Sequence, residues 1–318
     1  MNSSTVQRAR LASLDVLRGS NIAAMIVFHY LLLYYPEPVD AITGAIHWVG
    51  GQLAELFFYL AGAGVWFFLR RGAPSTLLKR GIFLFLVATL VGLFRKGYWF
   101  IEWTVIQDIG FAFVLMALLA HFTTRRFSVG LGLYILFGVL ARWFNYGGVG
   151  FFPFFPNVIY FLIGYGYAAL CPIRRNETSS IKSVALAVIV PMALIALGLA
   201  ASGWRLFPGM DWYSEALLSI GMFALIYFWF LWVWGSLEFK NPFGEYLIQI
   251  GRLSLTIYYV QQSLLRFLQA ISFHVVLVHP FLSYLVLMVS VLIGVFILLK
   301  LWRPFNYAWS LEWIMRKI

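Results

Sequence analysis

The chain has 318 residues, of which 62% are hydrophobic and 11% are charged, and its formal net charge is +11. Soluble domains carry about a quarter charged residues, so this composition excludes an ordinary soluble domain and is typical of an integral membrane protein. The single cysteine, Cys171, excludes an intramolecular disulfide and a cluster of thiolate metal ligands, and no metal site is expected.

Apolar runs of about 20 residues recur along the whole sequence, and each is long enough to cross a hydrocarbon core of about 30 Å. We predict an all-α fold, a polytopic transmembrane bundle of about ten to eleven helices that forms one integral membrane domain over residues 1–318. The predicted spans are residues 19–35, 52–69, 81–94, 107–121, 127–141, 157–171, 183–201, 215–235, 253–272 and 281–299. The first lacks a small-residue cleavage site, so we expect a retained helix and not a removed signal peptide.

The basic residues concentrate on one side of these spans. If the N-terminus lies inside, the outer segments hold only Arg95, Lys96, Arg142 and Arg205, and Arg266 lies within a span. Basic residues accumulate in short cytoplasmic loops, so we expect both termini in the cytoplasm. Topology then explains the positive charge. The lipid bilayer is the expected partner, and no nucleic acid is expected.

Three shorter stretches carry local predictions. Residues 95–106 are too short and polar to span, which predicts a re-entrant or interfacial segment on the outer face. Residues 237–250 predict a cytoplasmic loop with a short surface helix. The small residues of the run from Leu60 to Gly64 predict a close contact between two helices.

Two ionisable residues fall inside the first two predicted spans. His29 lies about 9 Å below the outer end of its span, and Glu55 lies about 6 Å past Gly51 on the next one. Ionisable groups at membrane depth usually face the bundle interior or a water-filled path. We therefore predict that His29 and Glu55 meet, although a satisfied interior hydrogen bond would also explain each of them.

His47 precedes Trp48 at the predicted outer mouth of the second span. A neutral imidazole can accept a proton near pH 7, which suits a general base that activates an amine or a hydroxyl. It also suits a histidine that is transiently acylated. An interfacial loop histidine is the alternative, and Trp48 is a candidate for the substrate pocket.

Asp15 and Arg18 stand three residues apart and share one helix face. Structurally, Asp15 in a first turn would complement the helix dipole with Ser13 as its cap, and Arg18 would extend to the inner surface. Functionally, Arg18 and Arg80 could meet the phosphates of a cytoplasmic cofactor, with Asp15 beside them.

Four further polar residues stand near membrane depth. Gln107 and Asp108 open the fourth predicted span, where Asp108 is either a capping residue or part of a substrate pocket and Gln107 a candidate for cofactor binding. Gln262 and Arg266, four residues apart on the ninth span, should point inward together. Arg266 then needs a carboxylate, and Glu55 and Asp108 are candidate partners.

Several motifs carry a resemblance to a known superfamily. Residues 10–19, followed by His29, resemble the first-helix signature of the transmembrane acyltransferases. Residues 47–62, from His47 through Glu55, resemble the second-helix region of prokaryotic proteins similar to heparan-α-glucosaminide N-acetyltransferase. Residues 78–80, 105–110 and 250–258 have counterparts in the same group, and residues 309–316 resemble a bacterial branch of the superfamily.

The resemblance implies an acyl-CoA-dependent acyltransferase in a prokaryotic cell membrane. The acyl donor would be acetyl-CoA, and the acceptor an amine or hydroxyl of an extracytoplasmic glycan or amino sugar. The catalytic histidine maps to His47 or His29, with His47 favoured, and the acid maps to Glu55. A homodimer stays open.

A second reading is a proton-coupled transporter or channel, because intramembrane histidines and acids also serve proton relays. The sequence shows no inverted repeat with interrupted helices, a common feature of transporters, so we favour the acyltransferase.

Overall fold

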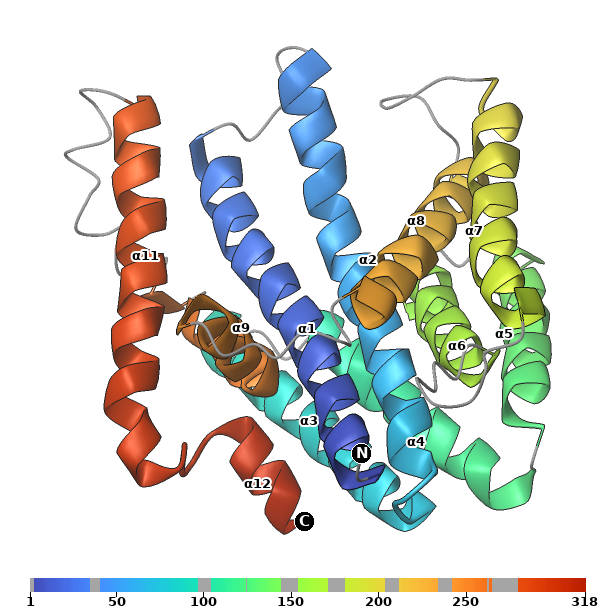
Figure 1. Ribbon diagram of the computed structural model, residues 1–318, viewed down its shortest axis with the longest axis horizontal. Helices are drawn as coiled ribbons and strands as arrows, with labels where there is room; N and C mark the ends of the chain where they lie inside the picture. The colour runs from blue at the N-terminus through green and yellow to red at the C-terminus, as the bar shows by residue number, and fades with distance from the viewer. Residues whose placement is uncertain are drawn as a thin grey trace. The chain divides into compact units, whose positions relative to one another are not determined.

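The computed structural model describes residues 3–34, 41–96, 104–123, 125–143, 154–170, 181–203, 212–233, 242–261, 263–264 and 280–318, and these residues form helices and no strand. The helices are α1 (Ser3–Tyr34), α2 (Ala41–Leu69), α3 (Pro74–Lys96), α4 (Val105–Phe122), α5 (Arg126–Trp143), α6 (Phe154–Leu170), α7 (Ile181–Ala201), α8 (Trp212–Val233), α9 (Pro242–Arg252), α11 (Pro280–Trp302), η2 (Arg303–Phe305) and α12 (Leu311–Lys317) (Figure 1). Residues 254–261 and 263–264 are also helical. The predicted all-α fold is confirmed for this part of the chain.

Five described helices are long and apolar enough to cross a membrane. These stretches are His47–Leu69, Pro74–Gly92, Val105–Phe122, Ser214–Leu231 and Met288–Phe305, and three shorter apolar helices are Arg126–Leu136, Asn157–Leu170 and Ala185–Ala201. Each of the eight overlaps one of the predicted spans. A multi-pass membrane protein is therefore supported, whereas the total of ten to eleven helices and the cytoplasmic termini stay predictions.

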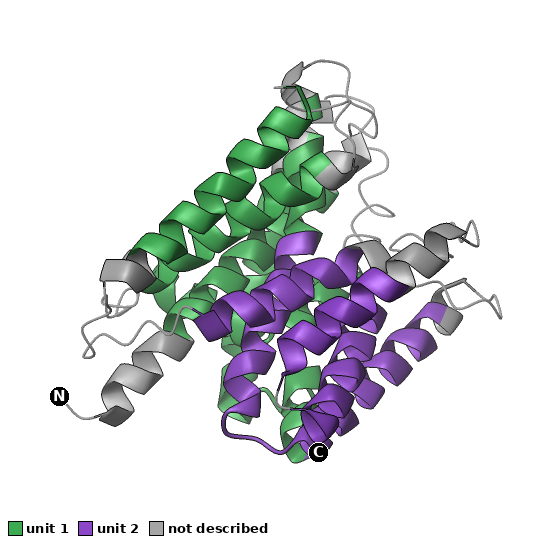
Figure 2. Cartoon of the chain, turned by 90° about the vertical axis from the view of Figure 1, so that its right-hand side faces the viewer, with its two compact units in different colours: residues 1–54, 175–178, 185–317 green, residues 55–174, 179–184, 318 purple. Residues whose placement is uncertain are grey.

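The chain forms two compact units (Figure 2). Unit 1 consists of residues 1–54, 175–178 and 185–317, and unit 2 consists of residues 55–174, 179–184 and 318. Unit 1 holds α1, α8, α9, α11 and α12 with most of α7, and unit 2 holds α3 to α6. The boundary falls within α2, between Ala54 and Glu55.

In unit 1, α1 and α9 touch backbone to backbone. A Cβ atom on Gly19 would collide with the carbonyl of Leu247, and one on Gly251 would collide with the carbonyl of Asp15. The absence of a side chain at both glycines allows this approach. Helix α9 confirms the short helix that was predicted within residues 237–250. The observed helix begins at Pro242.

In unit 2, α2 and α6 make the same kind of contact. A Cβ atom on Gly62 would collide with the carbonyl of Phe161, and one on Gly164 would collide with the carbonyl of Tyr59. The run from Leu60 to Gly64 is therefore a close-packing surface, as predicted.

Helix α4 begins with a reciprocal side-chain cap. The Thr104 hydroxyl accepts from the backbone N–H of Gln107 at 3.4 Å, and Gln107 Oε1 accepts from the backbone N–H of Thr104 at 2.8 Å. Gln107 Nε2 also donates to Thr89 Oγ1 of α3 at 3.0 Å. These bonds satisfy two otherwise free amides and place Asp108 in the first turn.

Two predicted helix boundaries are wrong. Helix α2 begins at Ala41 and not near residue 52, so His47 and Trp48 are helical and not in a loop. Gly50 and Gly51 weaken helix propensity, but Gly50 is buried where a Cβ atom would fall on the Phe28 ring, so tertiary packing overrides propensity. Helix α1 begins at Ser3, so Ser13 lies in its interior and cannot cap it.

Candidate functional site

A polar cluster joins α2 and α8 inside unit 1. Gln52 Nε2 donates to Glu215 Oε1 at 2.9 Å, and the Ser219 hydroxyl donates to Gln52 Oε1. The Trp48 indole interacts with the same Glu215 carboxyl. Polar groups inside a membrane need partners because no water is present to satisfy them. We call Trp48, Gln52, Glu215 and Ser219 the Gln52 cluster.

His29 of α1 meets a glutamine from the helical segment 254–264. Gln261 Nε2 lies 3.4 Å from His29 Nδ1, and Gln261 is 1% exposed while His29 is only partly buried. Among the described residues, the imidazole has no second hydrogen-bond partner. If Gln261 Nε2 donates to Nδ1, the neutral ring carries its proton on Nε2. A half-turn of the amide lets Oε1 accept from Nδ1–H, and this tautomer leaves Nε2 as the unprotonated, reactive nitrogen.

His47 reaches the same part of α1. Its ring packs edge-on against Phe28, with ring centroids 6.2 Å apart and an interplanar angle of 82°. Phe28 directly precedes His29 in the chain. The structure thus brings both predicted histidines to neighbouring positions along α1, His29 on α1 itself and His47 from α2.

Glu55 lies farther along α2 than predicted. Because α2 begins at Ala41, Glu55 stands about 21 Å along the helix from its first residue and about 12 Å beyond His47. The depth estimate for Glu55 counted from a helix start near Gly51, whereas the helix starts at Ala41. The pairing of Glu55 with His29 stays a prediction. Glu55 follows Gln52 by three residues, so the two share one face of α2.

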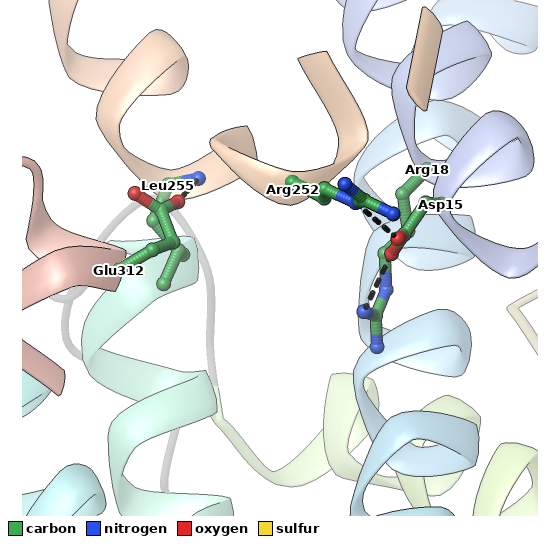
Figure 3. Close-up of polar contacts among 5 residues, drawn as sticks. All are labelled: Asp15, Arg18, Arg252, Leu255 and Glu312. Atoms are coloured by element: carbon green, nitrogen blue, oxygen red, sulfur yellow. Dashed lines mark hydrogen bonds and ion pairs between the residues drawn. The ribbon is translucent and has the colours of Figure 1, made fainter. Parts of the chain in front are cut away.

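The predicted neighbours Asp15 and Arg18 form part of a larger ion cluster in unit 1 (Figure 3). Arg18 Nη1 lies 4.0 Å from Asp15 Oδ1, and Arg252 Nε of α9 donates to Asp15 Oδ2 at 3.1 Å. Burial raises the pKa of the Asp15 carboxyl above its usual value, against the opposing effect of the two guanidinium groups. The cluster holds two cations and one carboxyl, so it carries a net positive charge.

Glu312 of α12 accepts hydrogen bonds from the start of the helical residues 254–261 (Figure 3). Its Oε1 accepts from the backbone N–H of Leu255 at 2.7 Å and of Thr256 at 3.2 Å, and its Oε2 accepts from the Thr256 hydroxyl at 2.5 Å. Burial raises the pKa of Glu312, and these hydrogen bonds oppose the shift. The same segment ends near Gln261, so Glu312 helps to position the partner of His29.

Unit 2 contains a buried acid without partners. Asp108 is 0% exposed, and among the described residues neither of its carboxylate oxygens has a hydrogen-bond partner. Its predicted neighbours Gln262 and Arg266 lie outside the described residues. Helix capping does not explain Asp108, because Thr104 and Gln107 perform that role at α4.

Arg80, the other predicted cofactor residue of unit 2, lies over the Phe68 ring at 4.8 Å. Gln107 uses both ends of its amide on Thr104 and Thr89. No group of three metal-ligating side chains forms within the described residues.

Sequence reasoning missed four polar partners: Gln52, Arg252, Glu215 and Gln261. Glu215 stood at the predicted start of a span and was not considered as a site residue. Gln261 directly precedes Gln262, and one residue of helix turns a side chain by about 100°. A search for every amide or acid inside an apolar span would have found Gln52, Glu215 and Gln261.

Comparison with known families identifies the class of protein. Residues 96–300, about two thirds of the chain, match the acyltransferase domain family of transmembrane type. The chain therefore belongs to this family and is a membrane acyltransferase. The matched stretch contains Asp108, Glu215 and Gln261, whereas His29 and Gln52 precede it. No curated protein and no solved structure gives a significant match to the chain.

Proposed function

We propose that this enzyme moves an acyl group, with acetyl as the first candidate, from cytoplasmic acyl-CoA to an amine or hydroxyl of an extracytoplasmic glycan or amino sugar. The observation that supports this most is His29, a titratable side chain inside an apolar helix whose Nδ1 is engaged by a buried amide. Such a group is costly in a membrane protein and usually functional. Family membership supports acyl transfer as its purpose.

The reaction would proceed at Nε2 of His29. This nitrogen takes the proton from the acceptor amine or hydroxyl while the acceptor attacks the thioester carbonyl. The new C–N or C–O bond forms, the C–S bond breaks, and the thiolate of CoA leaves and takes the proton held on His29 Nε2, which restores the neutral ring. Gln261 Oε1, with the amide turned, accepts from Nδ1–H while the ring is cationic. A positioned base of this kind contributes about 10²–10⁴ in rate.

His47, which the sequence favoured, lies against Phe28 and is proposed to contact the acceptor. The family resemblance suggests an acidic group beside the acceptor amine, and Glu55 and the unpartnered carboxyl of Asp108 suit that role. Trp48 would line the pocket through its place in the Gln52 cluster, and Gln262 and Arg266 are proposed as further pocket residues.

Each unit has a basic group that is a candidate contact for the donor nucleotide. Arg18 fits this role because the cluster with Asp15 and Arg252 carries a net positive charge. Arg80 presents a second guanidinium, and its contact with Phe68 limits its motion. Gln107 would act by fixing α4, since its amide is already engaged.

The test is acyl transfer by the purified protein in lipid nanodiscs, with radiolabelled acetyl-CoA and a panel of amino sugars and glycans. His29→Ala should lower transfer by about 10²–10⁴. His121→Ala is the matched control, because His121 lies exposed at the end of α4 and should transfer like the wild type. A larger loss of transfer activity in His47→Ala than in His29→Ala would show that His47, and not His29, is the general base.

Two outcomes would overturn the proposal. One is that the protein neither transfers nor hydrolyses acyl-CoA with any acceptor. The other is acyl-CoA-independent movement of a solute across proteoliposomes, the behaviour expected of a proton-coupled transporter. An acid-quenched sample with label bound to protein and released by hydroxylamine would indicate an acylated histidine in place of direct transfer.

A further inference from the structure

Two guanidinium groups flank a pair of aromatic rings in unit 2. Arg70 lies 5.8 Å over the Trp66 ring, and Trp66 packs edge-on against Tyr165 with ring centroids 5.5 Å apart. Arg126, the first residue of α5, interacts with the Tyr165 hydroxyl. The chain of contacts Arg70, Trp66, Tyr165 and Arg126 joins three helix ends, and we call it the Trp66 cluster.

The cluster has hydrogen-bond donors that no described residue satisfies. The indole Nε1 of Trp66 and the Nε of Arg126 are both buried and lack hydrogen-bond partners among the described residues. A buried N–H left unpaired loses the hydrogen bonds it had with water and gains none in return. Two such donors beside two cations call for an acceptor that carries negative charge.

No carboxylate in the described part of unit 2 supplies that charge. The only acids in the described part of unit 2 are Glu55 and Asp108. Glu55 precedes Trp66 by 11 positions on α2, about 16 Å along the helix, and Asp108 lies about 21 Å from the Phe122 end of α4, the end that precedes Arg126. Within the described residues, neither Arg70 nor Arg126 forms an ion pair. A bound anionic ligand would satisfy these donors.

We propose that the Trp66 cluster is a binding site for a phosphate group. Arg126 donates from its guanidinium, Trp66 donates from its indole, and Arg70 adds charge above the ring. Guanidinium groups suit phosphate because several N–H donors point in one plane. The phosphate belongs either to a soluble nucleotide or to an anionic lipid headgroup, and neither source requires the proposed function.

Two binding measurements distinguish the sources. In the first, adenosine 3′,5′-bisphosphate is titrated into the full protein in phosphatidylcholine nanodiscs, and the dissociation constant is measured by calorimetry. In the second, native mass spectrometry counts the phosphatidylglycerol molecules retained by protein taken from mixed phosphatidylcholine and phosphatidylglycerol membranes. Binding in either assay that depends on the Trp66 cluster supports the site and names its ligand.

The variants include a matched control. The double substitution Arg70→Gln with Arg126→Gln should weaken binding by about tenfold or more, since it removes two charge-assisted contacts. The control, Arg71→Gln with Arg125→Gln, removes the same charge from the neighbouring exposed positions and should bind like the wild type. Trp66→Phe keeps the ring contact with Tyr165 and removes only the donor, so it should fold normally and bind more weakly.

The site is overturned if neither probe binds, or if the control pair weakens binding as much as the Arg70 and Arg126 pair does. The latter result would mean that binding follows overall charge alone. Lipid binding by a protein without transfer activity would retain this site while removing the proposed function, so the two failures are distinguishable.

Discussion

Two sets of buried polar side chains differ in their hydrogen bonds: the Gln52 cluster with the His29–Gln261 pair in unit 1, and Asp108 with Trp66 in unit 2. In unit 1, Gln52 bridges Glu215 and Ser219, and Gln261 holds His29. In unit 2, Asp108 is fully buried with both oxygens unpartnered among the described residues, and the indole N–H of Trp66 likewise has no partner there.

The difference separates two uses of polarity at membrane depth. Side chains that satisfy one another hold a fixed geometry, which suits a group that must be oriented for reaction. Side chains left unsatisfied carry a free-energy cost that a ligand can remove. The Gln52 cluster and the His29–Gln261 pair therefore have the features of an orienting framework, and Asp108 and Trp66 have those of binding sites.

The largest effect is expected when the amide of Gln261, which orients His29, is removed. Gln261→Leu should lower acyl transfer by at least about tenfold, because the His29 imidazole would remain a base but would no longer be held in its orientation. The rate at saturating acceptor is the quantity to measure. Gln249→Leu on α9 makes the same chemical change away from the histidine and should leave the rate unaltered. Equal rates for Gln261→Leu and wild type would show that the contact has no role in positioning.

The second prediction compares Gln52, which hydrogen-bonds to Glu215 and Ser219, with Asp108, which has no hydrogen-bond partner among the described residues. Gln52→Leu should destabilise the protein by about 1–3 kcal/mol, because it takes the acceptor from the buried Ser219 hydroxyl and one of the donors from Glu215. Asp108→Asn keeps the shape and breaks no hydrogen bond between described residues, so its stability should equal or exceed that of the wild type. Thermal unfolding of both variants in one detergent gives the contrast. A large loss in Asp108→Asn would show that the Asp108 carboxyl is satisfied in the folded protein.

The glycine contacts are common to both units and give a third test. Gly62→Ala should destabilise unit 2 by about 1–3 kcal/mol, since the added methyl group would collide with the Phe161 carbonyl. Gly92→Ala on α3 is the control, because nothing lies within 4 Å of the new Cβ and alanine favours the helix. The order of thermal midpoints should be Gly92→Ala at or above wild type and Gly62→Ala below it.

The smallest expected effect concerns pH. Burial raises the pKa of Glu312 from 4.5, so the folded protein binds this proton more tightly than the unfolded chain. The contribution of Glu312 to the free energy of unfolding is therefore full below pH 4.5, and it is lost as the pH rises through the raised pKa. Glu312→Gln keeps an acceptor and cannot titrate.

The difference in thermal midpoint between wild type and Glu312→Gln should therefore fall as pH rises from about 4 to 7. A difference that grows over this range would mean that the folded state prefers the ionised carboxylate. Glu245→Gln, at an exposed position on α9, controls for general charge effects.

The fold followed from hydropathy wherever apolar runs were uninterrupted, as in α3, α4, α8 and α11. The start of α2 did not follow from the pattern, because Gly44, Gly50 and Gly51 disfavour a helix. Contacts with other helices, such as that of Gly50 with the Phe28 ring, support it. The close contact at Gly62 was predictable from small residues alone. Its partner on α6 was not, since a one-dimensional pattern does not identify the opposing helix.

The sequence predicted which types of residue form the site better than it predicted which residues contact one another. Asp15 and Arg18 lie on adjacent helical turns, so their spacing alone placed them together. His29 meets Gln261, which is 232 positions away, and no local pattern encodes a contact of that range. The pairing of His29 with Glu55 stays a prediction, and the depth estimate behind it depended on a helix boundary that the structure moves from residue 52 to Ala41.

The cap that Glu312 provides has a consequence for how the protein is made. Leu255 and Thr256 receive their hydrogen-bond acceptor from a residue 57 and 56 positions later, after α11 has been synthesised. The segment carrying Gln261 thus enters the bilayer before the carboxylate that completes its first turn exists. Until α12 docks, this segment should be a substrate for membrane chaperones and quality-control proteases, and assembly of the reactive histidine should be among the last steps of biogenesis.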